Sequence, residues 1–496
     1  MGSNAIQQVP TNTKGATVPF WIDGKEVVSP RTFDVYNPAL GKVVHQCSSA
    51  TEADAQAAVD AAARALPAWR AMVPTRRREI FLRAAALLEA RRDELVATMV
   101  EELGVATQWA DFNINTARDF TLDVAGRIVT VEGSVPTPQD PNTGAMVVKE
   151  PFGVVLAIAP WNAPYILGTR SVIFPMAAGN TVVFKGNELS PKVMWGICSV
   201  FAEAGLPDGV LNYIVHSTAN AAAVTSHLVA SPHVKKINFT GSTLVGRAIG
   251  RLAGEHLKPV LLELGGKAPA IVWEDADLAL AADQCALGAF LNSGQICMST
   301  ERIIVHRAVA ARFEALFLAA VDKFFPAAGE APLLIHGPAM EKVKRLLRDA
   351  RDKGATLLLN GGFDDNGGVE GARPGVAAAP RLRPTIVKGV TEDMDIYRTE
   401  SFGPTVALYE VGTEEEALRL ANDTEYGLSS AVFTEDLRRG LRLARGIETG
   451  ACHINSMSVH DESALPHGGA KGSGYGRFCA SGLEEWVRTK TITYRW

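Results

Sequence analysis

Beyond residue 147, short apolar runs alternate with helix-like segments, and this alternation constrains the fold more than any other feature of the chain. Residues 154–159 are apolar throughout, which is typical of a strand covered on both faces of its sheet. Similar runs follow at 181–185, 235–239 and 259–264, with helical patterns between them. Repeated strand–helix units at this spacing predict an α/β fold with a doubly wound parallel sheet.

The 496-residue chain is longer than one hydrophobic core normally organises, so two or three domains are expected. Ahead of the alternating region, an alanine-rich helix is expected to begin at Thr51, a favourable N-cap residue, and further helices at 76–103 and 107–128. Residues 130–146 are rich in Gly and Pro, and residues 487–495 alternate as an edge strand does. We expect these two segments to pair as an arm in a homo-oligomer.

Composition excludes several classes of function. The net charge is −5, and basic residues cluster only at Arg76, Arg77 and Arg78, so neither nucleic acid nor a membrane is an expected partner. The six cysteines lack CxxC spacing and the ten histidines form no HxxxH pair, which predicts reduced thiols and no metal site. The first 17 residues are polar and lack the core of a signal peptide, so a cytoplasmic protein is expected.

The loop 294–300, with the sequence GQICMST, joins a helical pattern at 278–291 to a strand-like run at 302–305 and carries Cys297. Catalytic groups often lie on loops between rigid elements, and a thiolate is a strong nucleophile. A single cysteine in an apolar chain is equally often a small buried hydrophobic residue. The loop by itself leaves both interpretations open.

Two polar residues at the ends of predicted strands are candidates for catalysis. Asn162 lies in a Pro-bounded turn after the strand at 154–159, where its amide could donate to an oxyanion or serve its own turn. Glu263 interrupts an apolar strand, and a carboxylate there is costly unless it is paired or useful. Burial is expected to raise the pKa of Glu263 toward the range of a general base.

A nucleotide site is suggested by residues 239–246, where a predicted strand ends and a predicted helix begins. The helix N-terminus offers free N–H groups to a pyrophosphate, although the spacing of Gly241 and Gly246 is GxxxxG rather than GxGxxG. Lys185 and Glu188, just beyond another strand, could hold ribose hydroxyls or form a solvated ion pair.

Five stretches together resemble the aldehyde dehydrogenase superfamily over nearly the whole chain. The resemblance implies that Cys297 is the nucleophile, Glu263 the general base and Asn162 a donor to the oxyanion. It also implies an NAD-binding domain at 18–129 and 149–262, a catalytic domain at 263–475 and an oligomerisation arm at 130–148 and 476–496. The stretches are PWN at 160–162, FTGS at 239–242, LELGGK at 262–267, GQIC at 294–297 and ESFGP at 400–404.

The family's cofactor positions can be carried over onto this chain. A carboxylate at Glu188 would accept ribose hydroxyls and repel a 2′-phosphate, so the resemblance implies NAD rather than NADP. Gly186 and Asn187 depart from the family's usual pattern and are expected to loosen that contact; Arg488 stands where some relatives carry a proton-relay glutamate, so a relay would need another group. The implied cofactor residues are Ala159, Pro160, Trp161, Lys185, Glu188, Phe239, Gly241, Ser242, Gly246, Leu264, Gly265, Glu400 and Phe402.

Residues 160–170, 295–302 and 452–462 look most like the salicylaldehyde, vanillin and benzaldehyde dehydrogenase branch. This resemblance implies oxidation of an aromatic aldehyde to its acid through a thiohemiacetal and a thioester on the cysteine. An aromatic slot is expected, with an arginine that meets a substrate oxygen; core packing for the tryptophan and a structural ion pair for the arginine are the alternatives. The expected substrate residues are Trp109, Tyr165, Arg170, Ile296 and Met298.

The sequence leaves alternative functions, which the same residues favour or disfavour. A succinate-semialdehyde-type enzyme would use Arg170 to bind a carboxylate, and a broad aliphatic aldehyde dehydrogenase would need no such group. Glu263 disfavours an enzyme that passes its thioester to coenzyme A, since that subclass lacks the base. The presence of Cys297 and Asn162 as well disfavours a non-catalytic member. A homodimer or homotetramer is expected.

Overall fold

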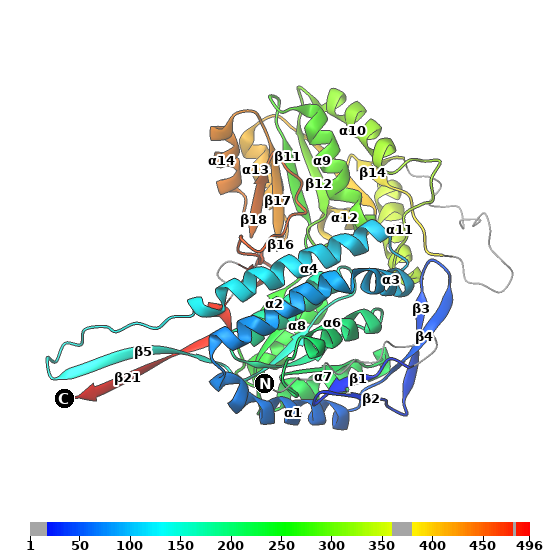
Figure 1. Cartoon of the computed structure of the whole chain (residues 1–496). Helices are drawn as coiled ribbons and strands as arrows, with labels where there is room; N and C mark the ends of the chain where they lie inside the picture. Colours follow the sequence, from blue (N-terminus) through cyan, green and yellow to red (C-terminus); the bar gives the residue numbers. More distant parts are fainter. Residues whose placement is uncertain (1–16, 360–378, 480–482) are drawn as a thin grey trace.

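The computed structural model describes residues 17–359, 379–479 and 483–496, and the fold is α/β with two sheets in two lobes (Figure 1). The first lobe, as the described residues define it, contains an eight-stranded sheet in the order β2-β1-β8-β7-β6-β9-β10-β20. The pairs from β8 through to β10 are parallel, whereas β1, β2 and β20 run antiparallel to their neighbours. The strands are β1 (Phe20–Ile22), β2 (Lys25–Val27), β6 (Val154–Ile158), β7 (Thr181–Lys185), β8 (Leu211–Ile214), β9 (Val234–Thr240), β10 (Val260–Glu263) and β20 (Gly474–Tyr475).

Helices follow the parallel strands in alternation, as the sequence predicts. The strand order reverses between β6 and β9, and in doubly wound sheets ligands bind at the carboxyl ends of the strands at such a point. Strands β6 and β7 are buried at every residue, which explains their continuous apolar sequences. The helices between these strands are α5 (Pro164–Ala177), α6 (Pro191–Glu203), α7 (Ala221–Ala230) and α8 (Thr243–Glu255).

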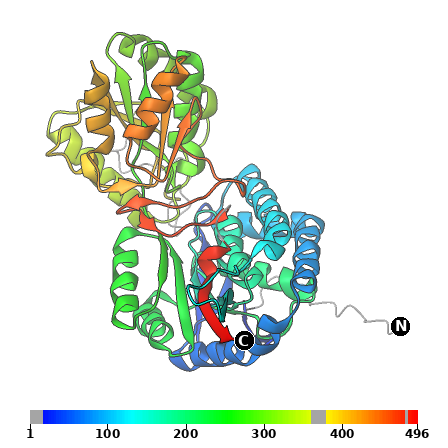
Figure 2. The same cartoon turned by 90° about the vertical axis from the view of Figure 1, so that its left-hand side faces the viewer.

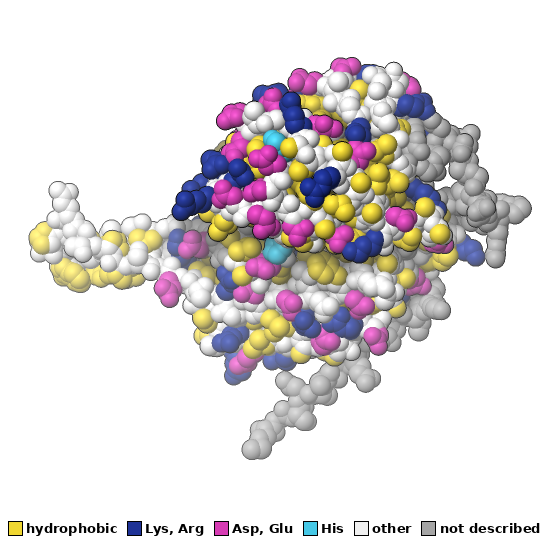
Figure 3. Space-filling model, turned by 90° about the horizontal axis from the view of Figure 1, so that it is seen from above, with side chains coloured by type: hydrophobic (Ala, Val, Ile, Leu, Met, Phe, Trp, Pro, Cys, Tyr) yellow, Lys and Arg dark blue, Asp and Glu magenta, His cyan; other side chains and the backbone are white. Residues whose placement is uncertain are grey.

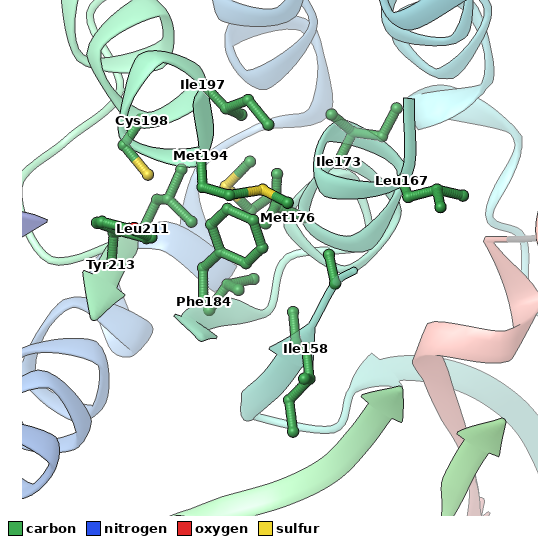
Figure 4. Close-up of a cluster of buried hydrophobic side chains, with 14 of the residues drawn as sticks. Ile158, Leu167, Ile173, Met176, Phe184, Met194, Ile197, Cys198, Leu211 and Tyr213 are labelled. Carbon is green, nitrogen blue, oxygen red and sulfur yellow. The ribbon is translucent and has the colours of Figure 1, made fainter. Parts of the chain in front are cut away.

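Figure 4 shows the core between α5, α6 and the sheet, where Phe184 of β7 lies among side chains of both helices. Met194 and Ile197 of α6 face α5 across this core, and all three of these residues are buried. Helix α5 is itself buried over its whole length. The interior position of α5 matters for the site, because the helix carries Arg170 into the body of the protein.

The helices at the start of the chain agree in part with the sequence prediction. Thr51 forms a capping box with Asp54, whose backbone N–H donates to the Thr51 hydroxyl. The single helix predicted at 76–103 is wrong, because Arg91 leaves helical geometry and divides it. The Arg91 guanidinium there pairs with Glu94 and Glu203. The four helices are α1 (Glu52–Ala71), α2 (Pro74–Ala90), α3 (Arg92–Leu103) and α4 (Thr107–Arg127).

The second lobe contains, in the described part of the chain, a seven-stranded sheet in the order β13-β14-β15-β12-β11-β17-β18, parallel except at β13. Its strands are β11 (Ala268–Val272), β12 (Thr300–His306), β13 (Thr356–Leu358), β14 (Thr385–Lys388), β15 (Thr405–Val411), β17 (Ser429–Phe433) and β18 (Ala451–Ile454). Its helices are α9 (Leu278–Phe290), α10 (Ala310–Phe324), α11 (Gly337–Asp352), α12 (Asp395–Arg398), α13 (Glu414–Asn422) and α14 (Leu437–Gly446).

The chain beyond β18 passes between the lobes and returns to the first sheet (Figure 2). Strand β20 pairs antiparallel with β10, with Gly474 opposite Glu263. Gly474 has a φ of +107°, and a Cβ there would lie 2.0 Å from the carbonyl oxygen of Leu262, so only glycine fits. The predicted catalytic range 263–475 therefore includes three residues of the sheet of the first lobe: Glu263 of β10, and Gly474 and Tyr475 of β20.

An arm of two antiparallel strands projects from the body (Figures 1 and 3). It pairs β5 (Thr143–Pro151) with β21 (Val487–Arg495) within one chain, so the predicted partner segment 130–146 is corrected to 143–151. Apolar side chains along the arm are exposed: Val135, Met146, Ile492, Tyr494 and Trp496. Two short pairs complete the described strands: β3 (Thr32–Asn37) with β4 (Lys42–Ser48), and β16 (Tyr426–Gly427) with β19 (Ala470–Lys471).

Candidate active site

A cavity of about 1020 Å³ lies beside the thiol loop and is lined mainly by apolar side chains. Helix α9 leads into this loop through Asn292, Ser293 and Gly294, all of which have positive φ angles. A Cβ at Gly294 would lie 2.2 Å from the carbonyl oxygen of Gly403, so the tight turn requires glycine. This turn places Cys297 against the cavity rather than in the core of the second lobe.

The structure brings the three predicted catalytic residues together. The Cys297 Sγ lies 3.8 Å from Oε1 of Glu263 and donates to that oxygen. The side-chain amide of Asn162 donates to the carbonyl oxygen of Gln295 at 3.0 Å, two residues before the thiol. Within the described residues, the second amide hydrogen of Asn162 and the backbone N–H of Cys297 donate to no other group. Two donors are thus available beside the sulfur.

Glu263 is fully buried and is contacted by Arg170 and His467. Oε2 of Glu263 accepts from the Arg170 guanidinium, and Oε1 lies 3.0 Å from Nε2 of His467. Burial alone would raise the pKa of Glu263, but the charges of Arg170 and His467 outweigh it and lower the pKa to about 2. The prediction that this pKa is raised is therefore wrong, because burial was considered without these partners.

The thiol is protonated in this arrangement. Burial, and then the negative charge of Glu263, raise the pKa of Cys297 well above its ordinary value, while Arg170 opposes them. A proton acceptor is therefore needed before the sulfur can attack. Oε1 of Glu263, to which the thiol already donates, is in position to be that acceptor.

Arg170 forms an ion pair inside the protein, which was one of its two predicted roles. Besides Glu263, its guanidinium binds Oδ2 of Asp461 at 2.7 Å and stacks on the Phe478 ring at 4.6 Å from the ring centroid. The residue also lines the cavity, so contact with a substrate oxygen stays a prediction. Its positive charge, however, is already met by two carboxylates.

Of the other predicted substrate residues, three line the cavity and one lies in the core. Trp109, Ile296 and Met298 line the cavity. Trp109 also donates through Nε1 to the backbone oxygen of Asn162 at 3.2 Å, so it supports the amide as well. Tyr165 is not among the lining residues: it is buried in the core, where its hydroxyl donates to the Leu95 carbonyl.

Several lining residues were not predicted from the sequence. They come from segments that are far apart in the chain, and local sequence carries no signal that these segments meet. Phe112 stacks on Trp109 with ring centroids 5.4 Å apart, which extends the aromatic wall. His467 and Asp461, the partners of the buried carboxylate and arginine, were also missed. The further apolar lining residues include Phe290, Phe324, Phe325, Met457 and Val459.

The predicted cofactor residues gather at the carboxyl ends of the parallel strands. Trp161 follows β6, and its ring meets that of Phe402 from the second lobe edge-on, with centroids 6.1 Å apart. Lys185 ends β7, and within the described residues neither its Nζ nor the carboxylate of Glu188 has a hydrogen-bond partner. The others lie after β6 (Ala159, Pro160), in or after β9 (Phe239, Gly241, Ser242), in α8 (Gly246), after β10 (Leu264, Gly265) and between α12 and β15 (Glu400).

The segment that carries Glu400 and Phe402 is held by a buried carboxylate, Glu301. Its oxygens accept from the backbone N–H of Ser401 at 2.8 Å and of Phe402 at 3.2 Å. Lys267 of the LELGGK stretch donates to the same carboxylate at 2.6 Å. Burial raises the pKa of Glu400 to about 7, and the like charge of Glu301 adds to this. No pattern in the sequence indicates this role of Glu301.

Two wider features bear on function. In the part of the chain that is described, no group of three or more His, Cys, Asp or Glu side chains has the geometry of a metal site. Among the helices of the described residues, none has the length and apolar character needed to cross a membrane.

Comparison with known proteins assigns the family. The model of the aldehyde dehydrogenase family matches residues 21–492. Vanillin dehydrogenase of Pseudomonas fluorescens is 44% identical over 484 residues, covering 96% of this chain and 97% of the relative.

Two solved structures share the fold with TM-scores of 0.90 each, covering 97% of this chain and 98% of theirs. One is a salicylaldehyde dehydrogenase of Pseudomonas putida G7 in complex with salicylaldehyde, at 35% identity. The other is described as an NADP-dependent enzyme of E. coli, at 31% identity. The chain therefore belongs to the aldehyde dehydrogenase family of oxidoreductases.

Proposed function

We propose that this enzyme oxidises an aromatic aldehyde to the corresponding carboxylic acid with NAD, through a thiohemiacetal and then a thioester on Cys297. One observation carries the proposal. The thiol of Cys297 lies beside the carboxylate of Glu263 and the amide of Asn162, at the wall of a large cavity lined by aromatic and aliphatic side chains. Nucleophile, base and oxyanion donor are the groups that acyl chemistry on a thiol requires.

In the first half of the reaction, the Cys297 proton moves to Glu263 and the sulfur attacks the aldehyde carbon. The negative charge that develops on the aldehyde oxygen is met by the free amide hydrogen of Asn162 and the backbone N–H of Cys297. When bound, NAD supplies the hydride acceptor that turns the thiohemiacetal into a thioester. Glu263 then passes the thiol proton to solvent and becomes a carboxylate again. In the second half it takes a proton from water, the resulting hydroxide adds to the thioester carbon, and the carbon–sulfur bond breaks to release the acid and the Cys297 thiolate.

The residues at the sheet edge fit a dinucleotide. A buried lysine without a hydrogen-bond partner is costly, and Lys185 gains one if ribose hydroxyls reach it. Glu188 supports NAD over NADP, because its carboxylate would repel a 2′-phosphate. The N-terminus of α8, capped by Ser242, presents N–H groups to a pyrophosphate.

The cavity supports an aromatic substrate. Its lining is rich in phenylalanine, and relatives of this chain are named vanillin and salicylaldehyde dehydrogenases. A succinate semialdehyde needs a cation for its carboxylate. Among the described lining residues, the cations are Arg170 and Arg381, and both already have carboxylate partners. These pairings disfavour the succinate-semialdehyde alternative.

The arm supports assembly into a homodimer or homotetramer. Its exposed apolar side chains, such as Ile492 and Trp496, would be covered if the arm crossed to a second subunit. Light scattering on the purified protein measures the mass directly, and a monomer at micromolar concentration would contradict this part of the proposal.

A substrate panel tests the reaction. Benzaldehyde, salicylaldehyde, vanillin, hexanal and succinate semialdehyde are each assayed with NAD and with NADP, and kcat/KM is determined from NAD(P)H absorbance. We expect the aromatic aldehydes with NAD to lead by at least about tenfold, since added apolar contact is worth about 1–3 kcal/mol. Faster turnover of hexanal would support the broad aliphatic alternative, and faster turnover of succinate semialdehyde would contradict the role assigned to the arginines.

A further inference from the structure

His467 contacts Oε1 of the base, whereas Arg170 contacts Oε2, and backbone hydrogen bonds hold His467 in place. Its N–H donates to the Phe478 carbonyl at 3.2 Å, and the Phe478 N–H donates back to the His467 carbonyl at 2.8 Å. The side chain is buried, with Nε2 at 3.0 Å from Oε1 of Glu263 and Nδ1 at 3.6 Å from Oδ1 of Asp461. The imidazole therefore lies between two carboxylates.

Four charged groups close a ring around this point. Arg170 bridges Glu263 and Asp461 on one side, and His467 bridges the same two carboxylates on the other. An ionised carboxylate only accepts hydrogen bonds, so a neutral imidazole would direct one lone pair at one of them. The doubly protonated imidazolium donates to Glu263, faces Asp461 as an ion-pair partner and leaves the four groups with no net charge.

The contacts at Oε1 of Glu263 affect how readily this carboxylate accepts a proton. This oxygen receives both the Cys297 thiol and the His467 donor. Acylation removes the proton of Cys297, so in the thioester the His467 donor is the one of these two contacts that remains on Oε1. A carboxylate held by Arg170 and an imidazolium is also a weak base, which reduces the driving force for proton transfer.

We propose that His467, backed by Asp461, is a positioning residue that holds Glu263 beside the thiol and governs when that carboxylate acts as a base. In its charged form the imidazolium keeps Glu263 ionised and weakly basic. After His467 loses the Nε2 proton, the remaining proton faces Asp461, Glu263 becomes a stronger base, and Nε2 can accept a proton from it. This inference rests on the proposed aldehyde oxidation and adds a proton switch to it.

The protons balance in the hydrolytic step. Water gives a proton to Glu263 while its oxygen bonds to the thioester carbon, and the carbon–sulfur bond breaks to leave the Cys297 thiolate. The protonated carboxyl of Glu263 then donates to the free Nε2 of His467, which regenerates the carboxylate. Asp461 lines the cavity and provides the route by which the imidazolium returns its proton to solvent.

The charges around His467 set the pH at which the switch operates. Burial lowers the pKa of His467, but Asp461 and Glu263 outweigh burial and the opposing charge of Arg170, so the pKa lies above its ordinary value. The Cys479 thiol donates to Oδ1 of Asp461, the oxygen that also faces the imidazole, and His453 of β18 interacts with the imidazole through its charge. Hydrolysis should therefore accelerate as pH rises through the pKa of His467.

The variant His467→Gln tests the switch, because its amide can still donate to Glu263 but does not titrate. The rate constant for thioester hydrolysis is measured from pH 5.5 to 9 by rapid mixing of enzyme, NAD and benzaldehyde followed by acid quench. The unmodified enzyme should lose about tenfold per pH unit on the acid side. In His467→Gln this acid limb should disappear; an acid limb with the same midpoint in both proteins overturns the proposal.

Asp461→Asn is the second variant and does not depend on the folding of the first. Removing this carboxylate should lower the pKa of His467, so the acid limb should move to lower pH by about one to three units. An unchanged or higher midpoint overturns the proposal.

A titration without substrate separates this inference from the proposed function. The protein is labelled at its ten histidines, and the imidazole signals are followed by NMR against pH. The signal of His467 is the one that is absent from His467→Gln, or the one that Asp461→Asn shifts most. It should titrate above about 6.5, the ordinary histidine value. A signal that titrates below this value overturns the role of His467. Absence of NADH formation with every aldehyde would instead overturn the proposed reaction.

Discussion

The substitution Glu263→Gln should separate hydride transfer from hydrolysis. Thioester formation needs Cys297 and the two oxyanion donors, whereas hydrolysis needs an activated water as well. Glutamine has nearly the shape of glutamate but cannot accept the proton of that water. The variant should therefore complete the first half of the reaction and stop at the thioester.

The expected loss of turnover follows from the role of Glu263 as a general base. General-base catalysis contributes about 10²–10⁴ in rate, which corresponds to about 3–5 kcal/mol in the barrier to hydrolysis. Steady-state turnover should fall by that factor. The thiol also loses its acceptor, Oε1, so formation of the thioester should slow, but by less.

The fold should survive the substitution, because Arg170 keeps a second carboxylate partner. Asp461 remains 2.7 Å from its guanidinium, so the arginine is not left as an isolated buried charge. The loss of stability should stay below the about 3–5 kcal/mol typical of a buried ion pair that loses one partner. Urea unfolding followed by tryptophan fluorescence measures it.

The assay mixes the variant rapidly with NAD and benzaldehyde and follows NADH absorbance. We expect a burst close to one NADH per active site, followed by very slow turnover. Glu102→Gln is a matched control: Glu102 is another buried carboxylate, bound to His45 and to backbone N–H groups far from the thiol in the chain. The control should turn over without a burst. Steady-state turnover of Glu263→Gln within about twofold of the unmodified enzyme would refute the role of the base, which predicts a loss of about 10²–10⁴.

Three further predictions test other parts of the site. Cys297→Ala should abolish aldehyde oxidation while NAD binding, measured by calorimetry, is retained; Cys452→Ala is the control, and more than a few per cent residual activity would mean that another nucleophile acts. Glu188→Gln should raise kcat/KM with NADP and narrow a preference for NAD of at least about tenfold; equal use of both cofactors by the unmodified enzyme would count against the assignment. Glu301→Gln should weaken the hydrogen bonds from the backbone N–H groups of Ser401 and Phe402. The loosened Phe402 should raise KM for NAD more than KM for benzaldehyde. Equal changes in the two KM values would argue against this role of Glu301.

The first sheet was predictable because each of its parallel strands is a short, continuous apolar run that can be recognised from neighbouring residues alone. A run such as Val154–Ile158 is apolar at every position because helices cover both faces, and the helix between it and the next strand fixes the parallel direction. The pairing of Val487–Arg495 was predictable in part for the same reason, since strand alternation is also local. The register and the partner strand, Thr143–Pro151, were not.

The electrostatics of the base could not be predicted, because its partners are distant in the chain. Arg170 is 93 residues from Glu263, and His467 is 204 residues away. The sequence shows that a carboxylate interrupts an apolar strand, which predicts burial but not the charges that reverse its effect on the pKa. Tyr165 was misplaced for a related reason: α5 is buried on every side, so its periodicity does not show which face meets the cavity.

The return of the chain to the first sheet has a consequence for synthesis of the protein. Ser473, next to β20, donates to the Gly265 carbonyl, and these residues are 208 positions apart. A ribosome that adds about 5–20 residues per second needs roughly 10–40 s to make the intervening chain. Throughout that interval β10, which ends at the base, has no partner on one side. An unpaired strand edge can pair with other chains, so the nascent first lobe is exposed to this hazard until β20 emerges.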